Sequence, residues 1–407
     1  LCMALIDEAD VVLLDEARVP LVLSQPAPAL APDLLAGALA CARALRRGRD
    51  FTLGEDRLPR LTDDGRALVA AWRPAGAMPS RQREDLVAQA LAALHLYSRD
   101  RDYVVRDGTV AIVDAASGRI AAGRVWSRGL HQLIELKEGC PPSARNTTAA
   151  QITYQRFFRR YLRLGGMSGT LAGAEAELAA TYGMAMVRIA PRLPSRRRLQ
   201  QRTLYADAAA LWPAMARRAA VLHRAGRPLL IGTATVADSD AAARALAAIG
   251  LPHVVLNARH DQAEADVVAR AGEPARITVA TSMAGRGTDI RLAADAAARG
   301  GLHVILCQHN AARRIDRQFI GRTARNGEPG SHDTLLSLDM PLFRRYLPRW
   351  WRALAARRRP APAWFARLTI AVPQWLEERR HRALRRQLLR ADLRRERDLD
   401  FCRRTAS

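Results

Sequence analysis

The stretch 5-LIDEADVVLLDEARVPLVLS-24 continues a short apolar run and places two acids at its end. The run, from Cys2 to Ile6, predicts a buried parallel strand. Asp7 and Glu8 follow it, and open α/β sheets bind ligands beyond the carboxyl ends of their strands. Mg²⁺ keeps most of its water and needs few carboxylates, so Asp7 could hold it while Glu8 activates a water. The stretch predicts half of a nucleotide site. The alternative is an acidic turn from strand to loop with no bound ligand.

The other half of such a site is the phosphate loop G-x-x-x-x-G-K-[ST], whose lysine reaches the phosphates. The single lysine, Lys137 in 135-ELKEG-139, has no glycine loop before it. Residue 1 is Leu and opens directly into the apolar run, so we expect the loop to lie upstream of Leu1. The alternative is a protein that has lost the loop. Without it, the chain should bind ATP poorly and hydrolyse it negligibly.

Composition indicates several domains and an anionic partner. The chain has 407 residues, 49% of them apolar, and a formal net charge of +24. Residues 341–407 supply +13 of that charge, from 19 arginines against six acids. Such an excess favours nucleic acid, an acidic protein face or an anionic lipid surface. The five cysteines form no CxxC pair or Cys/His cluster, so we expect a reducing cytosol and no zinc site.

Downstream, strand and helix patterns alternate, and repeated βα units predict a doubly wound, mostly parallel sheet. The expected strands are 228–235, 253–258, 277–283, 302–307 and 334–339, with helices near 238–249, 261–271 and 311–321.

Two loops of this second fold carry chemistry. In 281-TSMAGRGTDI-290 the glycines around Arg286 let backbone N–H groups and a guanidinium approach phosphate closely. In 318-QFIGRTAR-325 the spacing of Arg322 and Arg325 predicts one helical face, from which both could reach a γ-phosphate on a neighbouring domain. The alternative for the arginine pair is a solvated surface.

From Leu5 to about residue 340 the chain resembles SecA, the bacterial preprotein translocase ATPase family. DEAD-type helicases share the acid pair and the arginine motif, but they lack 13-LLDEARVPLVLS-24 and the counterparts of 123–139 and 152–170. The segments that carry the resemblance are 6–24, 61-LTDDG-65, 100–120, 123-GRVWSRGLHQLIELKEG-139, 152-ITYQRFFRRYLRLGGMSGT-170, 253–290 and 300–331.

The resemblance implies two RecA-like nucleotide-binding folds of the superfamily 2 helicase type, the first of them incomplete. Its domain boundaries would be 1–25 with 144–190 for the first fold, 26–143 for an inserted α+β preprotein cross-linking domain, 191–342 for the second fold and 343–407 for a truncated helical scaffold.

The resemblance also implies roles for particular residues, with ATP and Mg²⁺ as cofactors. Asp7 would organise Mg²⁺ through water, and Glu8 would activate the attacking water. Ser168, Gly169 and Thr170 would couple the nucleotide site to domain movement. The catalytic arginines would be Arg322 and Arg325, and the nucleotide-binding residues Gly285, Arg286, Gly287, Asp289 and Gln318.

As a function, the resemblance implies an ATP-driven motor subunit for export of unfolded preproteins. Its partners would be those preproteins, a SecYEG-type channel and an anionic membrane surface, on the cytoplasmic face of the bacterial inner membrane. A homodimer is compatible with it, whereas a nucleic-acid partner is not favoured. The alternatives are a DEAD-type nucleic-acid helicase and a non-hydrolysing SecA-like accessory protein.

Three departures from the family pattern stand out. MSGTL at 167–171 replaces the usual MTGTA, which keeps a hydroxyl at Ser168 and adds bulk at Leu171. In the arginine motif Ala324 stands where the family has Gly. Gln308 replaces an acid, which puts the local salt-bridge network in doubt.

The tail begins with 343-FRRYLPRWWRALAARRR-359 and becomes helical in pattern after Pro373. One interpretation is docking on an anionic membrane or an acidic channel loop, with Trp350 and Trp351 as anchors. The other is a scaffold helix laid against the two folds. The family's later regions, a two-helix finger, a wing and a zinc-binding tail, have no counterpart, so we expect a short paralogue or a fragment.

Overall fold

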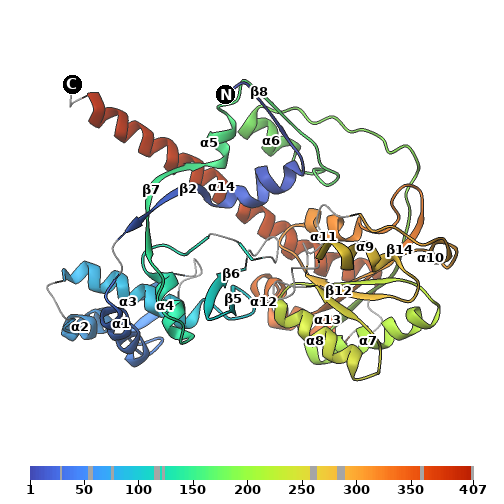
Figure 1. The fold of residues 1–407 in the computed structure, drawn as a ribbon, viewed down its shortest axis with the longest axis horizontal. Helices are drawn as coiled ribbons and strands as arrows, with labels where there is room; N and C mark the ends of the chain where they lie inside the picture. Colours follow the sequence, from blue (N-terminus) through green and yellow to red (C-terminus); the bar gives the residue numbers. More distant parts are fainter. Residues whose placement is uncertain are drawn as a thin grey trace. The chain divides into compact units, whose positions relative to one another are not determined.

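The structure, a computed structural model, divides into two compact units (Figure 1). One unit combines Leu1–Leu21 with Ile152–Ser407, and the other holds Val22–Ala115 and Arg119–Gln151. The described residues are 1–27, 30–53, 58–74, 78–113, 120–121, 124–256, 264–281, 289–357 and 362–404.

The smaller unit packs its helices around one apolar core that includes Leu35, Phe51, Leu91 and Leu133. The helices are α1 (Pro32–Ala44), α2 (Asp63–Ala71), α3 (Ser80–His95) and α4 (Leu130–Lys137). Two antiparallel pairs complete it, β3 (Phe51–Leu53) with β4 (Pro59–Leu61) and β5 (Tyr103–Arg106) with β6 (Thr109–Ile112). Its connections to the larger unit run through the paired strands β2 (Pro20–Ala27) and β7 (Arg145–Thr153). Lys137 at the end of α4 is tied to α3 and the residues after it, because its ammonium donates to the carbonyls of Ala93 and Tyr97 at 3.0 and 2.8 Å.

The larger unit is built on a six-stranded sheet in the order β11-β12-β10-β13-β14-β9, and every pairing in it is parallel. This confirms the predicted doubly wound sheet; β9 was not expected. The strands are β9 (Arg196–Tyr205), β10 (Leu229–Thr233), β11 (Val254–Leu256), β12 (Ile277–Thr281), β13 (His303–Leu306) and β14 (Pro329–Ser337). β10, β12 and β13 are buried along their whole length, as expected for strands covered on both faces.

Helices cover both faces of this sheet (Figure 1). α7 (Ala208–Arg224) and α8 (Val236–Ala247) pack on one face, and α9 (Glu264–Ala269) and α11 (Arg313–Ile320) lie over the other. α11 sits close because of Gly232 in β10: a Cβ there would lie 2.4 Å from the ring of Phe319. A short helix, α10 (Ala294–Ala298), precedes β13.

The first fold contributes a smaller piece, in which β1 (Met3–Ile6) and β8 (Arg163–Gly166) form a parallel pair. The helical turns around it are η1 (Val11–Asp15), η2 (Glu16–Arg18), α5 (Tyr154–Phe158) and α6 (Glu175–Tyr182). The expectation of a buried strand at 2–6 is wrong here, since the side chains of Met3 and Leu5 are 67% and 69% exposed. Among the described residues β1 pairs with β8 alone, and a two-strand sheet cannot cover both of its faces.

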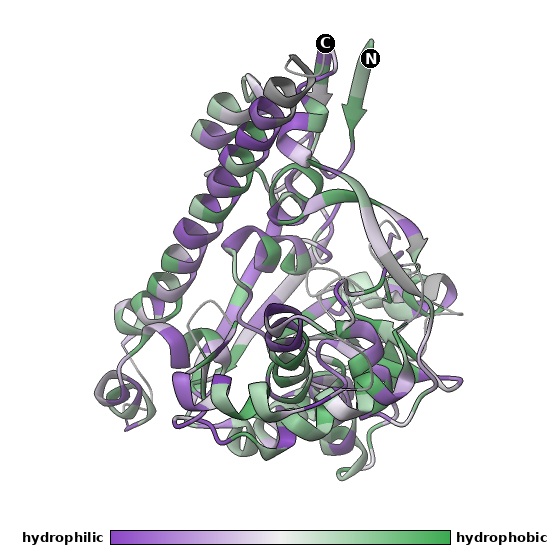
Figure 2. Cartoon of the chain, turned by 90° about the vertical axis from the view of Figure 1, so that its left-hand side faces the viewer, coloured by the Kyte–Doolittle hydropathy of each residue, from purple (hydrophilic) through white to green (hydrophobic). Residues whose placement is uncertain are grey.

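The tail folds as α12 (Pro341–Tyr346), α13 (Arg349–Arg357) and the 42-residue α14 (Ala363–Arg404). Pro373 lies inside α14, so the prediction that the helix begins after it is wrong; the helix starts ten residues earlier. Hydrophilic residues recur along all of α14 (Figure 2). In the described part of the chain, no helix is long and apolar enough to cross a membrane.

Candidate nucleotide site

The site begins where β1 and β8 end side by side. Because the two strands are parallel, the loop after Ile6 and the loop after Gly166 leave the same sheet edge. Two backbone hydrogen bonds join the loops, from Met167 N to Ile6 O at 2.9 Å and from Ala9 N to Met167 O at 3.0 Å. A Cβ on Gly166 would lie 2.8 Å from that of Ala9, so this close approach needs glycine.

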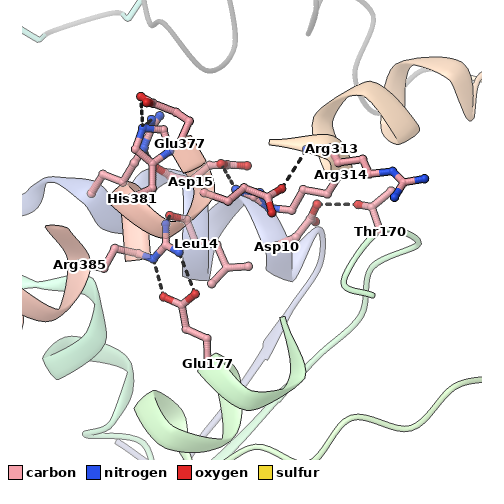
Figure 3. Close-up of polar contacts among 12 residues, drawn as sticks. Asp10, Leu14, Asp15, Thr170, Glu177, Arg313, Arg314, Glu377, His381 and Arg385 are labelled. Carbon is pink, nitrogen blue, oxygen red and sulfur yellow. Dashed lines mark hydrogen bonds and ion pairs between the residues drawn. The ribbon is translucent and has the colours of Figure 1, made fainter. Parts of the chain in front are cut away.

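Ser168 and Thr170, two of the three residues expected to couple nucleotide to domain movement, are bonded to Asp10, a buried carboxylate with no predicted role. Ser168 Oγ donates to Asp10 Oδ1 at 2.7 Å. Thr170 Oγ1 donates to Asp10 Oδ2 at 2.6 Å (Figure 3). Thr170 N also donates to Ser168 Oγ at 3.1 Å. The hydroxyl that the MSGTL variant keeps at Ser168 is therefore used. The final Asp of the DEAD sequence was the signal that could have pointed to this role.

Glu8 forms a hydrogen bond between the two folds. Its backbone is left-handed, with φ of +49°, and its N–H donates to Asp7 Oδ1 at 2.8 Å. Gln318 Nε2, on α11 of the second fold, donates to Glu8 Oε2 at 2.9 Å. A non-glycine residue at positive φ is uncommon and often occurs at functional sites. The turn thus brings an acid from one fold into contact with the arginine-motif helix of the other.

Arg322 and Arg325 do not share a helical face, contrary to the prediction. α11 ends at Ile320 with Gly321 as its C-cap, and Ala324 has φ of +57°. The helix therefore ends before both arginines, which lie in the turn that follows it. Arg322 is buried, with its guanidinium 5.6 Å from the ring centre of Phe319.

Arg325 pairs with Asp289, which is also one of the predicted nucleotide-binding residues. Arg325 Nη1 lies 2.6 Å from Asp289 Oδ1, and both side chains are about half exposed. An ion pair this exposed contributes at most about 1 kcal/mol, so it can open readily for a phosphate.

Gly285, Arg286 and Gly287 lie in 282–288, outside the described residues. Gln308, which follows β13, is fully buried, and neither its amide nitrogen nor its oxygen has a partner among the described residues. The position thus carries a neutral amide, without any salt bridge, where the family pattern has an acid.

Further ion pairs hold the first-fold piece against α11 and α14 (Figure 3). Arg314 of α11 pairs with the buried carboxylate of Asp15. Arg385 of α14 donates to both oxygens of Glu177 on α6, at 2.7 and 2.8 Å. Despite burial, the guanidiniums of Arg385 and Arg382 keep the pKa of Glu177 below its usual range. Buried bidentate contacts of this kind fix orientation as well as distance.

Mg²⁺ would fit this site through Asp7, an exposed carboxylate at a strand tip. Within the described ranges no group of three or more His, Cys, Asp or Glu could hold a metal. Mg²⁺ takes one or two carboxylates and fills the rest of its shell with water and substrate oxygens. Asp7 is therefore the residue that would hold the ion's water shell.

Comparisons with known proteins find SecA domains and SecA subunits. The SecA DEAD-like domain matches residues 1–179, and the SecA P-loop domain matches 194–299 and 293–357. Protein translocase subunit SecA 3 of Magnetococcus marinus is 42% identical over 98% of this chain and 62% of its own. Protein translocase subunit SecA 2 of Bordetella avium is 43% identical with the same coverage, and subunit SecA of Halothermothrix orenii is 41% identical over 84% of this chain and 41% of its own.

The chain thus spans about three-fifths of the length of the first two relatives. Both nucleotide-binding folds are matched by SecA domains, and together the matches cover most of the chain. The two folds are RecA-like, of the superfamily 2 type. The chain belongs to the SecA family.

Proposed function

We propose that this chain is part of an ATP-driven motor that exports unfolded preproteins through the Sec channel. The observation that carries the proposal is the hydrogen bond from Gln318 to Glu8. A motor must transmit the state of its nucleotide from one fold to the next. A contact between the acid beside the strand tip and the arginine-motif helix is suited to that task.

In this proposal ATP with Mg²⁺ would supply the phosphoryl group that is transferred to water. Asp7 would hold the metal's water shell at the end of β1. Glu8 would orient the attacking water and accept its proton, with Gln318 fixing one carboxylate oxygen. Arg322 and Arg325 would stabilise the negative charge of the transferred group, Arg325 after release from Asp289.

The coupling step would run through Asp10. Its two oxygens hold Ser168 and Thr170, so a shift of the turn at 7–10 would move the 168–170 loop with it. Arg317 of α11 also donates to Ala172 O at 3.1 Å, just beyond that loop. Both folds therefore contact the same short segment, which supports its role as the coupling element.

The domain roles follow the family pattern. Residues 1–25 with 144–190 would form the first fold, 191–342 the second and 343–407 the scaffold. Residues 26–143 would grip the unfolded preprotein, and a separate core in the smaller unit supports an independent domain there. Binding to a SecYEG-type channel at the cytoplasmic face of the inner membrane, with anionic lipid near the basic tail, would complete the assembly.

We further propose that the 407-residue chain binds ATP weakly, because it contains no phosphate loop whose lysine could reach the phosphates. Lys137 is committed to carbonyls of the smaller unit. Isothermal titration of the 407-residue chain with ADP should give no submicromolar affinity. A submicromolar dissociation constant would show that the described residues form a sufficient site without a phosphate loop.

Hydrolysis itself is best tested in a polypeptide that carries a phosphate loop ahead of Leu1. Its ATPase rate should rise with unfolded preprotein and channel-containing membranes. Glu8→Gln should lower the rate about 100-fold or more while ADP still binds, since general bases contribute about 10²–10⁴. An active enzyme stimulated by RNA instead of preprotein would favour the helicase alternative.

A further inference from the structure

A hollow lined by arginines lies between the second fold and α14, away from Glu8 and Asp7. Its volume is about 330 Å³, the size of a small ligand pocket. We call it the arginine hollow. It is lined by Arg197, Arg202, Leu306, Arg313, Asp316, Arg317, Ile320, His332, Thr334, Arg367, Ile370, Ala371 and Gln374.

Three separate elements aim cations into the hollow. Arg313 and Arg317 are one turn apart on α11, and Arg367 lies on the α14 face that also carries Ile370 and Gln374. All three are exposed; the charged ends of Arg313 and Arg367 are available to a ligand from solvent, whereas Arg317 keeps one nitrogen on Ala172 O. The remaining two arginines come from β9.

A β-bulge places both β9 arginines on this side of the sheet. Arg197 and Arg202 are five residues apart, which in a regular strand would put them on opposite faces. The register between β9 and β14 shifts at His332 and Asp333, whose partners are Leu199 and Gln201. The extra residue returns Arg202 to the face of Arg197, and bulges that re-aim side chains are typical of functional sites.

Among the described residues, no carboxylate forms an ion pair with Arg202, Arg313 or Arg367. Partial burial and the guanidiniums of Arg367 and Arg313 lower the pKa of Arg202, as expected where cations converge.

Asp316 is the one carboxyl group among the described lining residues. It accepts hydrogen bonds from Asn310 Nδ2 at 2.7 Å and from Gln374 Nε2 at 2.5 Å. Burial raises the pKa of this carboxyl to about 7, so much of it is uncharged at neutral pH. The lining therefore opposes a bound anion less than a fully ionised carboxylate would.

We propose that the arginine hollow binds a small molecule that carries two or more phosphate groups. Guanidinium forks match phosphate oxygens in pairs, and several converging forks suit a polyvalent anion better than a single carboxylate. Thr334 adds a hydroxyl that can donate to a phosphate oxygen, and Leu306, Ile320 and Ile370 offer an apolar floor for an organic part. Since Arg313 and Arg317 belong to the helix that carries Gln318, such a ligand would tie α11 to α14.

Isothermal titration with inorganic pyrophosphate, at 50 and 200 mM salt, tests the proposal on the 407-residue chain. Arg202→Gln with Arg367→Gln should weaken binding at least about tenfold, as expected from losing two charge-assisted contacts. The matched control is Arg217→Gln with Arg390→Gln, two exposed arginines outside the hollow that remove the same charge. The control pair should change the affinity less than about twofold, and thermal unfolding should show both variants folded.

Two outcomes would overturn the proposal. One is the absence of pyrophosphate binding, or a loss of equal size in both variants, which would mean that only net charge matters. The other is an unchanged pyrophosphate affinity in the hollow variant together with reduced co-sedimentation on phosphatidylglycerol vesicles, which would assign the arginines to a membrane surface. Because Asp7, Glu8, Arg322 and Arg325 stay intact in both variants, failure here leaves the proposed ATPase function untouched.

Discussion

At the scale of single residues, backbone conformation decides what the motif side chains can do. Glu8 and Ala324 both adopt positive φ, at +49° and +57°. The first lies in the turn that places Glu8 at the strand tip in contact with Gln318. The second lies in the turn after α11, between Arg322 and Arg325. Gly330 packs against the second turn, where a Cβ would lie 2.2 Å from Thr323 Oγ1. The sequence shows the residue types, but neither turn can be read from them.

Ala324→Gly should change the free energy of unfolding by less than about 0.5 kcal/mol. Relief of left-handed strain of about 1–2 kcal/mol is offset by the lost buried methyl, about 0.8 kcal/mol, and by the greater freedom of unfolded glycine. The same substitution at Ala243, inside α8, relieves no strain and should cost about 1 kcal/mol. Urea unfolding of both variants measures the difference, and equal losses at the two positions would contradict the argument.

At the scale of elements, α14 contacts both folds, as expected for a helix laid against them, and its role as a scaffold remains a prediction. Asp392 accepts from Thr153 N and Oγ1, both at 2.9 Å, and Gln374 reaches Asp316 on α11. Trp351 stacks on Phe365 and donates to Thr369 Oγ1 at 3.1 Å, whereas Trp350 is 64% exposed. Of the two expected membrane anchors, Trp351 is thus engaged within the fold, and docking on lipid remains a prediction for the exposed surface alone.

Asp392→Ala should release α14 locally from the first-fold piece. The substitution leaves both donors of Thr153 buried without an acceptor, a loss of about 2–3 kcal/mol. Hydrogen exchange at the Thr153 amide should accelerate at least about tenfold if local opening governs it. Asp398→Ala, at an exposed position of the same helix, is the control and should leave exchange at Thr153 unchanged. Equal protection in both variants would show that α14 is not held there.

The joint between α11 and α14 should weaken as pH rises. The pKa of Asp316 is raised to about 7 from an ordinary value of 3.8, chiefly by burial. The unfolded chain therefore releases this proton first, and stability is lost between about pH 4 and pH 7 at up to about 1.4 kcal/mol per unit. Above pH 7 both states are ionised and the loss is complete.

Comparison with Asp316→Asn isolates the contribution of Asp316 ionisation to the free energy of unfolding, since asparagine stays uncharged and keeps a carbonyl acceptor. The free energy of unfolding of the parent chain, relative to the variant, should fall across pH 4–7 and level off above it. Subtraction cancels the opposite contribution of His309, whose pKa burial lowers to about 4. A difference that is flat across this range would show that Asp316 is ionised in the folded protein throughout.

At the scale of the whole larger unit, the first-fold piece, the second fold and α14 form one connected body. Asp15–Arg314 and Glu8–Gln318 join the two folds, and Glu177–Arg385 joins the first to the scaffold. The arginine hollow lies on the second fold's own contact with α14. The contact with Glu8 and the contact with α14 therefore share one eight-residue helix, α11.

Much of the fold follows from the sequence alone, because its signals are local. Repeated βα patterns predict the parallel sheet, and the acid pair after an apolar run predicts the strand tip. β9 is not predicted, because its arginine-rich sequence lacks the apolar run of a buried sheet strand. It becomes a strand of the sheet through parallel pairing with β14. The start of α14 was missed since Pro373 reads as a helix boundary, although a helix packed by its neighbours can retain it.

The candidate site divides in the same way. Asp7, Glu8, Ser168, Thr170 and Gln318 were named from motifs, and their roles in catalysis and coupling remain predictions. Tertiary structure decided that Asp10 holds the coupling loop, that Arg325 faces Asp289 and that five arginines converge in a hollow. These depend on chain segments far apart in sequence and on backbone angles at single residues, and local pattern encodes neither.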